Sequence, residues 1–410
     1  MSENKHWTEE DIKNVVEKAN KDNLQNVSLA DSFGTTERNF IAIGMGDGGC
    51  NIISGISKAI PKAFTIAYNT VIESLDKTIA SIKIYPEGKN GSGKDRQFSQ
   101  DTFREASYKA LLNNVQTAIA SRKNVEFVLI VSTTAGGTGS GSSPMAANLI
   151  AQNVDIPVIL MGIYPAMDED ATAQYNAMSW QTELININYH NRMEGLAEIP
   201  YIILDNSDNM KASSTSVLST HDTVNNQAVE IVKILSGDLF GDTNIQSIDN
   251  RDLRMLLDNF GGRLAIYGTI QRPAVGVSLD DMLLELMTKW NEPVPSSMSA
   301  FGLFVKGPED LIRSTDTNLI KLQQSICSVN AKYNHLEISD EVYIAIICAG
   351  CNVPDSRMQL MKQRYEDIIN SQRRQSMEVS SLMDGMDNPL GNRRTPRKRG
   401  NDFDLSALDF

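Results

Sequence analysis

The chain has few cysteines, few histidines and a deficit of basic residues, and each shortage excludes a class of protein. Four cysteines in 410 residues are too few for a disulfide framework. We assign the pair Cys348 and Cys351, which ends an apolar strand-like run, a structural role. The four histidines show no His-Glu-x-x-His spacing, so we predict no metal site built by the protein. The net charge of −13 argues against a general nucleic-acid coat.

Long hydrophobic runs are also absent from the sequence. No apolar segment approaches the roughly 18–20 residues that cross a bilayer, and residues 1–21 are polar and charged throughout. We therefore expect neither a signal peptide nor a membrane span, and we expect a cytoplasmic protein. A hydrophobic content of 41% and a charged content of 22% are ordinary for a globular protein, and the length predicts two domains.

Strands and helices alternate from Asn39 onwards, which is typical of a parallel α/β sheet. We predict an N-terminal arm (1–38), a Rossmann-like parallel-sheet domain (39–217), a long core helix (218–246) and a second, mixed α/β domain (247–352). A C-terminal helix (353–377) and a flexible tail (378–410) follow. The expected strands are Phe40–Gly44, Ala63–Tyr68, Phe127–Ser132, Pro157–Tyr164, Tyr201–Leu204, Leu264–Ile270, Ala300–Lys306 and Glu341–Ala349.

The most informative segment, Thr134 to Pro144, directly follows the buried strand Phe127–Ser132. It places four glycines among small hydroxyl residues at the point where a strand passes into a helix. Glycine permits a positive φ and the close approach of a ligand, and successive N–H groups beside a helix N-terminus bind anions. The segment has no lysine, so we predict that it holds phosphate with backbone N–H groups and hydroxyls. A tight turn alone needs only one or two glycines.

Two other glycine-rich loops suggest alternatives. Gly44 to Gly49 satisfies the Gly-x-Gly-x-x-Gly pattern of dinucleotide-binding folds, but the next strand ends in Tyr68-Asn69-Thr70 without the acid that holds a ribose. Gly88 to Asp95 nearly matches a P-loop, but Asp95 replaces the hydroxyl residue that binds Mg²⁺, and we expect no helix directly after it. A nicotinamide-dependent enzyme is therefore a distant alternative.

The segment Ala135 to Gly141 resembles the glycine signature of the tubulin/FtsZ superfamily of filament-forming GTPases, with alanine in place of the first glycine. The resemblance covers roughly residues 39–352 and is stronger in the loops than in the second domain. It implies GTP and GDP as ligands, with Mg²⁺ bound through the nucleotide. The implied phosphate contacts are Gly46, Asp47, Gly48, Asn51, Asn69, Gly91, Ser92, Gly93, Ala135, Gly136, Gly137, Thr138, Gly139 and Ser140.

The resemblance also implies contacts to ribose and base. Glu169 falls in the ribose-contact loop, although the arginine that often follows it in the family is absent. Asn206 follows the strand Tyr201–Leu204, and His221 and Asn225 lie four residues apart on one helix face. His221 would stack on guanine, and the two amides would donate and accept hydrogen bonds. Asn226 competes with Asn225, because the register is open by one residue.

The segment Ser247 to Arg254 resembles the family's NxDxxDxR loop, with serine in place of the asparagine. In the family this loop reaches the nucleotide site of the neighbouring subunit. The resemblance therefore implies that Asp249 and Asp252 are catalytic in trans and help polarise the attacking water. We predict hydrolysis after head-to-tail assembly, which generates open filaments. A helix N-cap role for either aspartate is the structural alternative.

The C-terminal segment carries a basic run, Arg393–Arg399, followed by the apolar residues Phe403, Leu405, Leu408 and Phe410. It is either a solubilising tail or a peptide that docks on a partner. Together with the N-terminal arm and the long terminal helix, it makes the chain resemble the TubZ-type tubulins of plasmids and phages, which act on DNA through a DNA-bound adaptor protein. We predict DNA segregation or positioning. An FtsZ-like division protein and a non-hydrolysing nucleotide-dependent scaffold are the alternatives.

Overall fold

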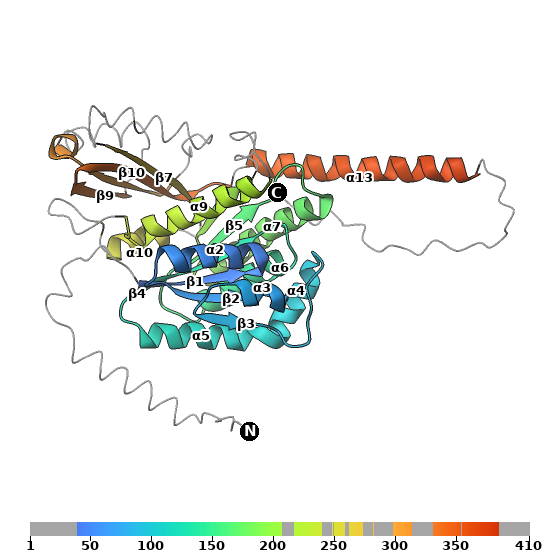
Figure 1. Ribbon diagram of the computed structural model, residues 1–410, viewed down its shortest axis with the longest axis horizontal. Helices are drawn as coiled ribbons and strands as arrows, with labels where there is room; N and C mark the ends of the chain where they lie inside the picture. Colours follow the sequence, from blue (N-terminus) through green and yellow to red (C-terminus); the bar gives the residue numbers. More distant parts are fainter. Residues whose placement is uncertain are drawn as a thin grey trace, which may run out of the picture.

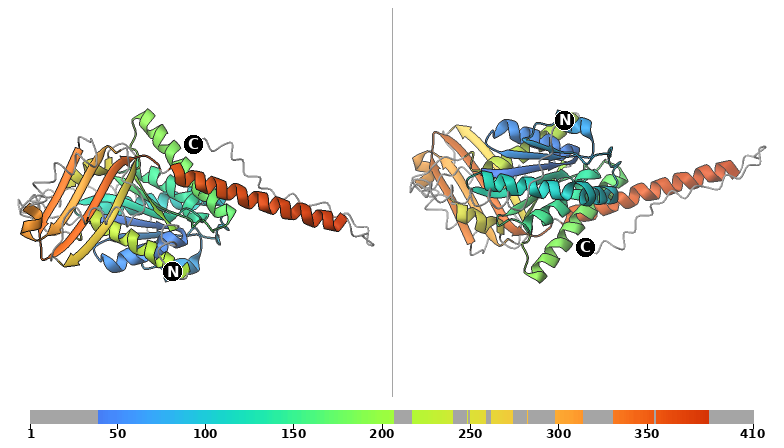
Figure 2. Two further views of the ribbon diagram at one scale, coloured as in Figure 1. Left: turned by 90° about the horizontal axis from the view of Figure 1, so that it is seen from above. Right: turned by 90° about the horizontal axis from the view of Figure 1, so that it is seen from below.

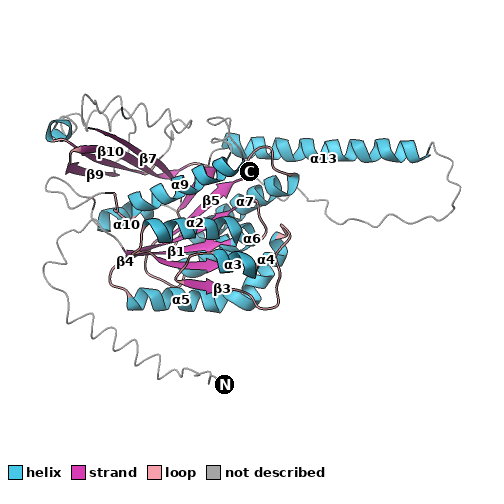
Figure 3. Cartoon of the chain, in the orientation of Figure 1, coloured by secondary structure: helices cyan, strands magenta, loops and turns pink. Residues whose placement is uncertain are grey.

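The computed structural model describes residues 39–206, 217–239, 248, 250–258, 262–273, 282, 298–313, 331–353 and 355–384. These residues form a ten-stranded sheet with helices on both faces, which confirms the predicted α/β class (Figure 1, Figure 3). The strands are β1 (Asn39–Met45), β2 (Phe64–Tyr68), β3 (Ile82–Ile84), β4 (Val125–Thr133), β5 (Val158–Tyr164), β6 (Tyr201–Asp205), β7 (Arg263–Pro273), β8 (Ala300–Gly307), β9 (Ala331–Ile338) and β10 (Glu341–Cys351).

The helices connect these strands and cover both faces of the sheet (Figure 1). They are α2 (Gly46–Ala59), α3 (Ile72–Lys77), α4 (Arg96–Thr102), the π-helical turn η2 (Phe103–Ser107), α5 (Tyr108–Ser121), α6 (Thr138–Ala151), α7 (Ala171–Glu194), α9 (Val217–Leu235), α10 (Asn250–Asp258) and α13 (Asp355–Asp384). Among the described residues, no helix is both long and apolar enough to cross a membrane.

Strands β1 to β6 run parallel in the order β3-β2-β1-β4-β5-β6. Their C-terminal ends therefore meet at one edge of the sheet, which we call the carboxyl edge, and their N-terminal ends meet at the opposite, amino edge. In the central strand β1, Gly44 pairs with Ala67 of β2 and with Val131 of β4. The loops that follow these three strands consequently start side by side, at the place where parallel α/β sheets bind ligands.

The core lies on both faces of the sheet, because alternate residues of each strand point to opposite sides. Phe127, Leu129 and Val131 of β4 pack with α2, α9 and α10, whereas Val128 and Ile130 pack with α5, α6, α7 and α13. All five side chains are fully buried. A continuous apolar run of this kind is what a parallel strand covered on both faces requires.

The sheet continues beyond β6 into the part of the chain predicted as a second domain. Strand β7 pairs parallel with β6 through Tyr201–Arg263 and Ile202–Leu264. Strand β10 lies antiparallel between β7 and β8, and β9 extends the sheet as a parallel neighbour of β8. The two predicted units thus share one sheet, and β9 is a strand that the sequence pattern did not indicate.

Helix α9 links the two edges of the sheet. It packs on α2 through buried residues that include Val224 and Ala228, and past its end Asp238 pairs with Lys62, just before β2, at 3.3 Å. Because Lys62 lies at the amino edge, α9 runs from the carboxyl edge to the amino edge. In Figure 1, α10 lies at the left end of the body, and α13 projects to the right.

The C-terminal helix is longer than predicted, because α13 continues to Asp384, past the expected end at residue 377. Its base is held at the carboxyl edge, where Arg357 pairs with Asp205 and donates to the Pro165 carbonyl at 2.7 Å. From there it extends well beyond the rest of the body (Figure 2). The predicted N-terminal arm (1–38) and the basic run Arg393–Arg399 lie outside the described residues.

Candidate functional site

The first glycine loop contacts the third at the carboxyl edge. Gly46 has a φ of 73°, which favours glycine, and a Cβ built there would lie 2.9 Å from the Gly139 nitrogen. A Cβ on Gly139 would lie 2.8 Å from the Met45 carbonyl oxygen, and one on Gly48 would collide with Thr133. Side chains at these positions would separate the two loops, so glycine is required for their close approach.

The second glycine loop reaches the same place. A Cβ on Gly137 would lie 2.8 Å from the Asp95 nitrogen, and Gly91 and Gly93 both have positive φ, at 75° and 58°. A row of hydroxyls joins the loops, because the Thr138 hydroxyl lies 2.8 Å from that of Thr70 and donates to that of Ser92 at 3.1 Å. The structure thus brings together the three loops that the sequence singled out.

The expectation that no helix directly follows the Gly88 to Asp95 segment is wrong. A helix does follow it directly, since α4 begins at Arg96. The Asp95 carboxylate accepts a hydrogen bond from the Phe98 N–H at 3.0 Å and is therefore the N-cap of α4. Asp95, which stands where a P-loop has its hydroxyl residue, therefore caps a helix.

The third loop presents N–H groups at the N-terminus of α6, whose N-cap is Gly137. Within the described part of the chain, the N–H groups of Gly136 and Gly137 donate to no other group. The nearby Lys94 forms an ion pair with Asp170, with its Nζ 2.6 Å from the carboxylate. The loops therefore form an anion cradle that depends on backbone N–H groups, hydroxyls and the helix dipole.

The Lys94–Asp170 pair fixes the rim of this cradle. Asp170 is the N-cap of α7 and accepts a hydrogen bond from the Ala173 N–H at 2.8 Å. Partial burial alone would raise the pKa of Asp170, but the hydrogen bonds from Lys94 and Ala173 outweigh it and hold the pKa below its usual value. Asp170 therefore stays ionised at neutral pH, and Lys94 is paired.

Ser140, expected as a phosphate contact, points back into its own helix. Its hydroxyl is buried and donates to the Gly136 carbonyl. Such i to i−4 bonding is common for serine in helices. The Ser140 side chain therefore supports the loop, and its backbone N–H is the group at the N-terminal turn of α6.

Asp47 and Asn69, predicted from separate segments, meet at the rim of the first loop. The Asn69 amide donates to the Asp47 carboxylate at 2.6 Å and accepts the Val71 N–H at 3.2 Å. Asn69 is buried, whereas Asp47 and Asn51 are exposed on the first turns of α2. This arrangement fits a magnesium ion held mainly by nucleotide phosphates, because Asp47 offers one carboxylate beside them.

The residues predicted to contact sugar and base lie further along the carboxyl edge. Glu169 accepts the Ala166 N–H at 2.9 Å and so closes its own loop. Asn206, directly after β6, is buried, and its Oδ1 has no hydrogen-bond partner among the described residues. An orphaned buried acceptor of this kind fits a ligand donor such as a base N–H.

Helix α9 carries the remaining base candidates. Asn225 is half-buried next to the buried Val224, whereas Asn226 is exposed. Burial therefore favours Asn225 as the residue that faces a ligand. His221 belongs to α9, but its side chain lies outside what the structure describes.

The predicted catalytic residues lie away from these loops. Asp252 is half-buried on α10, and Asp249 lies outside the described residues. The neighbouring Arg254 donates to the carbonyl of Asp155, which precedes β5. Helix α10 therefore sits at the amino edge, whereas the glycine loops follow the strands at the carboxyl edge. Within one chain, Asp252 and the cradle therefore lie at opposite ends of the parallel strands.

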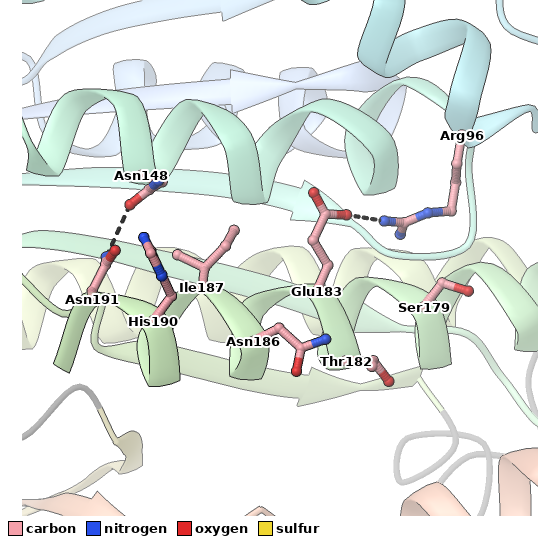
Figure 4. Close-up of a pocket in the computed structure, with 9 residues that line it drawn as sticks. All are labelled: Arg96, Asn148, Ser179, Thr182, Glu183, Asn186, Ile187, His190 and Asn191. Carbon is pink, nitrogen blue, oxygen red and sulfur yellow. Dashed lines mark hydrogen bonds and ion pairs between the residues drawn. The ribbon is translucent and has the colours of Figure 1, made fainter. Parts of the chain in front are cut away.

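A separate open groove of about 530 Å³ runs between α6 and α7 (Figure 4). It contains the ion pair between Arg96 of α4 and Glu183 of α7. Burial raises the pKa of Glu183 and lowers that of Arg96, and in each case the partner's charge opposes the shift. The groove is lined by Arg96, Asn148, Ser179, Thr182, Glu183, Asn186, Ile187, His190 and Asn191 and includes no residue of the glycine loops.

Known proteins share sequence and fold with this chain. Residues 39–188 match the GTPase domain of the tubulin/FtsZ family. Over 212 residues the chain is 26% identical to the tubulin-like protein CetZ5 of Haloferax volcanii, a match that covers 48% of this chain and 49% of the relative. Among the curated relatives it matches, the chain spans between 21% and 58% of their length.

Solved structures show the same fold. A GTPγS-form protofilament of TubZ from Bacillus thuringiensis serovar israelensis has a TM-score of 0.69 at 17% identity, covering 86% of this chain and 94% of that chain. An empty FtsZ dimer of M. jannaschii has a TM-score of 0.62 at 17% identity, covering 82% and 92%. The fold is therefore that of tubulin and FtsZ, and the likeness extends to both subfamilies.

Proposed function

We propose that this chain, whose residues 39–188 match the tubulin/FtsZ GTPase domain, binds and hydrolyses GTP and polymerises head to tail in the cytoplasm. The adjacent subunit supplies Asp249 and Asp252 to complete each active site. Their carboxylates orient and polarise the water that attacks the γ-phosphate. GDP and phosphate are the products, and Mg²⁺ is bound through the nucleotide.

The observation that carries this proposal is that the glycine loops and α10 lie at opposite edges of the sheet within one chain. The anion cradle lies at the carboxyl edge, and α10 with Asp252 lies at the amino edge. Stacking one copy on the next brings the amino edge of one subunit onto the carboxyl edge of its neighbour. A heterologous contact of this kind leaves a free surface at each end, so it continues into a filament.

The three loops hold the phosphates in this proposal, and Glu169 contacts the ribose. Asn206 offers guanine its orphaned Oδ1, Asn225 provides a second amide, and His221 stacks on the base. Because Lys94, the lysine of the second loop, is paired with Asp170, the developing charge is stabilised by N–H groups, Mg²⁺ and the helix dipole.

For the cellular role we propose plasmid or phage DNA segregation or positioning, through an adaptor protein bound to the C-terminal segment. The support is the basic run Arg393–Arg399 on a chain with a net charge of −13, together with the likeness to TubZ. An FtsZ-like role in division has comparable fold support and is the alternative. Two measurements separate these roles. Capture of a DNA-bound adaptor protein from a plasmid-bearing host would support segregation, and recruitment of the protein to a division ring would support division.

The enzymatic proposal is tested by measuring phosphate release and light scattering over a range of protein concentrations. We expect the specific GTPase rate to rise as assembly begins. Asp249→Ala and Asp252→Ala should lower kcat by about a hundredfold or more and leave GTP affinity within about twofold, because general-base assistance is of that size. Arg251→Ala, an exposed substitution on the same helix, is the matched control.

Two results would contradict the proposal. One is a specific rate that does not depend on concentration through the range where filaments form. The other is nucleotide-dependent assembly without phosphate release in the wild-type protein, which would favour the non-hydrolysing scaffold.

A further inference from the structure

A buried amide on α7 bridges two of the glycine loops. Asn176 is 2% exposed, and its Nδ2 donates to the carbonyl oxygens of Lys94 and Ala135 at 3.0 Å and approaches that of Gly136 at 3.3 Å. Lys94 belongs to the second loop, and Ala135 and Gly136 belong to the third. One side chain from a helix outside both loops therefore fixes their relative position.

The direction of these hydrogen bonds decides what the third loop presents. In a trans peptide, the C=O of one residue and the N–H of the next point in opposite directions. When Asn176 holds the carbonyls of Ala135 and Gly136, the N–H groups of Gly136 and Gly137 point away from α7. These are the N–H groups that donate to no other described group. Without the amide, the peptide between Ala135 and Gly136 can rotate and present its carbonyl oxygen, which repels a phosphate, whereas the Gly136 carbonyl still accepts from the Ser140 hydroxyl.

Helix α7 is a rigid support for this amide. Its N-cap Asp170 pairs with Lys94, and the Trp180 indole donates to the Ser143 hydroxyl on α6 at 2.9 Å. One turn beyond, Glu183 pairs with Arg96 at the start of α4 (Figure 4). These contacts tie α7 to the elements that follow the second and third loops, so Asn176 keeps a fixed position relative to both.

Asparagine suits position 176 better than aspartate, the residue closest to it in shape. Its amide offers two N–H donors, whereas an ionised aspartate of nearly the same size offers none and would place a negative charge against three carbonyl oxygens. The function of the side chain therefore lies in its donors and not in its volume.

We propose that Asn176 is a positioning residue for nucleotide phosphates. It aims the N–H group of Gly136 into the cradle, shares with Ser140 the orientation of the Gly137 N–H, and sets the spacing between the second and third loops. The proposal rests on the nucleotide binding proposed above. It assigns to α7 a role in recognising the phosphates, in addition to its packing role.

The test is a ligand series measured at protein concentrations below assembly, with GTP, GDP and guanosine, the last of which has base and sugar but no phosphate. For Asn176→Ala and Asn176→Asp we expect GTP and GDP affinity to fall by about tenfold to a hundredfold, the value of one to two charge-assisted hydrogen bonds. Guanosine affinity should stay within about twofold. A donor role requires the aspartate variant to lose at least as much as the alanine variant.

The matched control is Asn188→Ala on the same helix. Asn188 is also a buried amide, and it exchanges two hydrogen bonds of 2.8 Å with the backbone of Ile199, away from the loops. We expect Asn188→Ala to lower the melting temperature about as much as Asn176→Ala and to leave GTP affinity unchanged.

Three outcomes would overturn the inference while leaving the proposed function intact. They are wild-type GTP affinity in Asn176→Asp, an equal loss for guanosine and GTP, and a loss of GTP affinity in Asn188→Ala as large as that in Asn176→Ala. A wild-type protein that binds no guanine nucleotide would instead contradict the proposed function, and the inference with it.

Discussion

At the carboxyl edge of the sheet the centre of the candidate site is built from glycines and small hydroxyl residues, with charged residues such as Lys94 and Asp170 at its rim, whereas the amino edge carries charged side chains such as Asp252 and Arg254. Three glycine loops, joined by the hydroxyls of Thr70, Thr138 and Ser92, form the first surface. The second carries the Lys62–Asp238 pair and α10. The first surface offers hydrogen-bond donors to an anion, and the second offers carboxylates.

This difference underlies the proposal that each edge supplies half of a site. In that proposal the N–H groups of the carboxyl edge hold the phosphates, and the carboxylates of the amino edge act on the nucleotide of a neighbouring copy.

The largest expected effect is at Gly46 of the carboxyl edge. Gly46→Ala combines a strained φ with a Cβ only 2.9 Å from the Gly139 nitrogen. The loops must move apart, so GTP affinity should fall by about a hundredfold, the value of two hydrogen bonds to a charged group. Equilibrium binding of a fluorescent GTP analogue measures this loss.

The control is Gly195→Ala at the end of α7. Its φ of 67° gives a similar strain, about 1–2 kcal/mol, but a Cβ there meets nothing within 4 Å. Both variants should lose the stability that the strained φ costs, and only Gly46→Ala should also lose GTP affinity. Equal binding by the two would show that the loops tolerate separation and would break the account of the carboxyl edge.

A smaller effect is expected at Asn206. Replacing it with alanine removes the orphaned acceptor, so GTP should bind about tenfold more weakly, and discrimination against ATP should fall. The melting temperature without nucleotide should stay close to that of the wild type, because Oδ1 has no partner to lose among the described residues. A large loss of stability with unchanged GTP affinity would assign Asn206 to the fold instead.

The smallest effect concerns two buried thiols. Cys50 lies in the second turn of α2, next to the first glycine loop, and burial raises its pKa to about 12. The reactive thiolate is therefore scarce at pH 8, and labelling should be slow and should accelerate as pH rises. GTP should slow Cys50 labelling a further few-fold by suppressing local opening.

Cys348, buried in β10, serves as the reference. Its labelling should not respond to GTP, because β10 lies several strands away from the cradle. Site-resolved mass spectrometry follows both thiols in one sample. Equal protection of both by GTP would indicate a global effect and not one confined to the glycine loops.

The parallel half of the sheet could be predicted from sequence because its signals are local. The run Phe127 to Val131 is apolar on both faces, and glycine loops follow β1 and β4 directly. Strand β9 was missed because Lys332, Asn334 and Glu337 interrupt any apolar run. The continuity of the sheet rests on two pairs between β6 and β7, which no local pattern indicates.

The site was predicted in part for the same reason. Glycines that need a close approach are visible in sequence, but the amides that hold them are not. Helix α7 buries Gln174, Asn176, Gln181, Asn188 and Asn191 beside apolar residues, and polar residues of this kind are expected on a solvated face when only the sequence is known. The role of Asp95 as an N-cap was hidden by its likeness to a P-loop position.

Mixing two inactive variants tests whether two subunits share each active site. Gly46→Ala has a damaged cradle and intact acids, and the double variant Asp249→Ala with Asp252→Ala has the reverse. We predict that the mixture hydrolyses GTP, up to about a quarter of the wild-type rate, the share of contacts that join an intact cradle to intact acids. A mixture no more active than the sum of its components would contradict the claim.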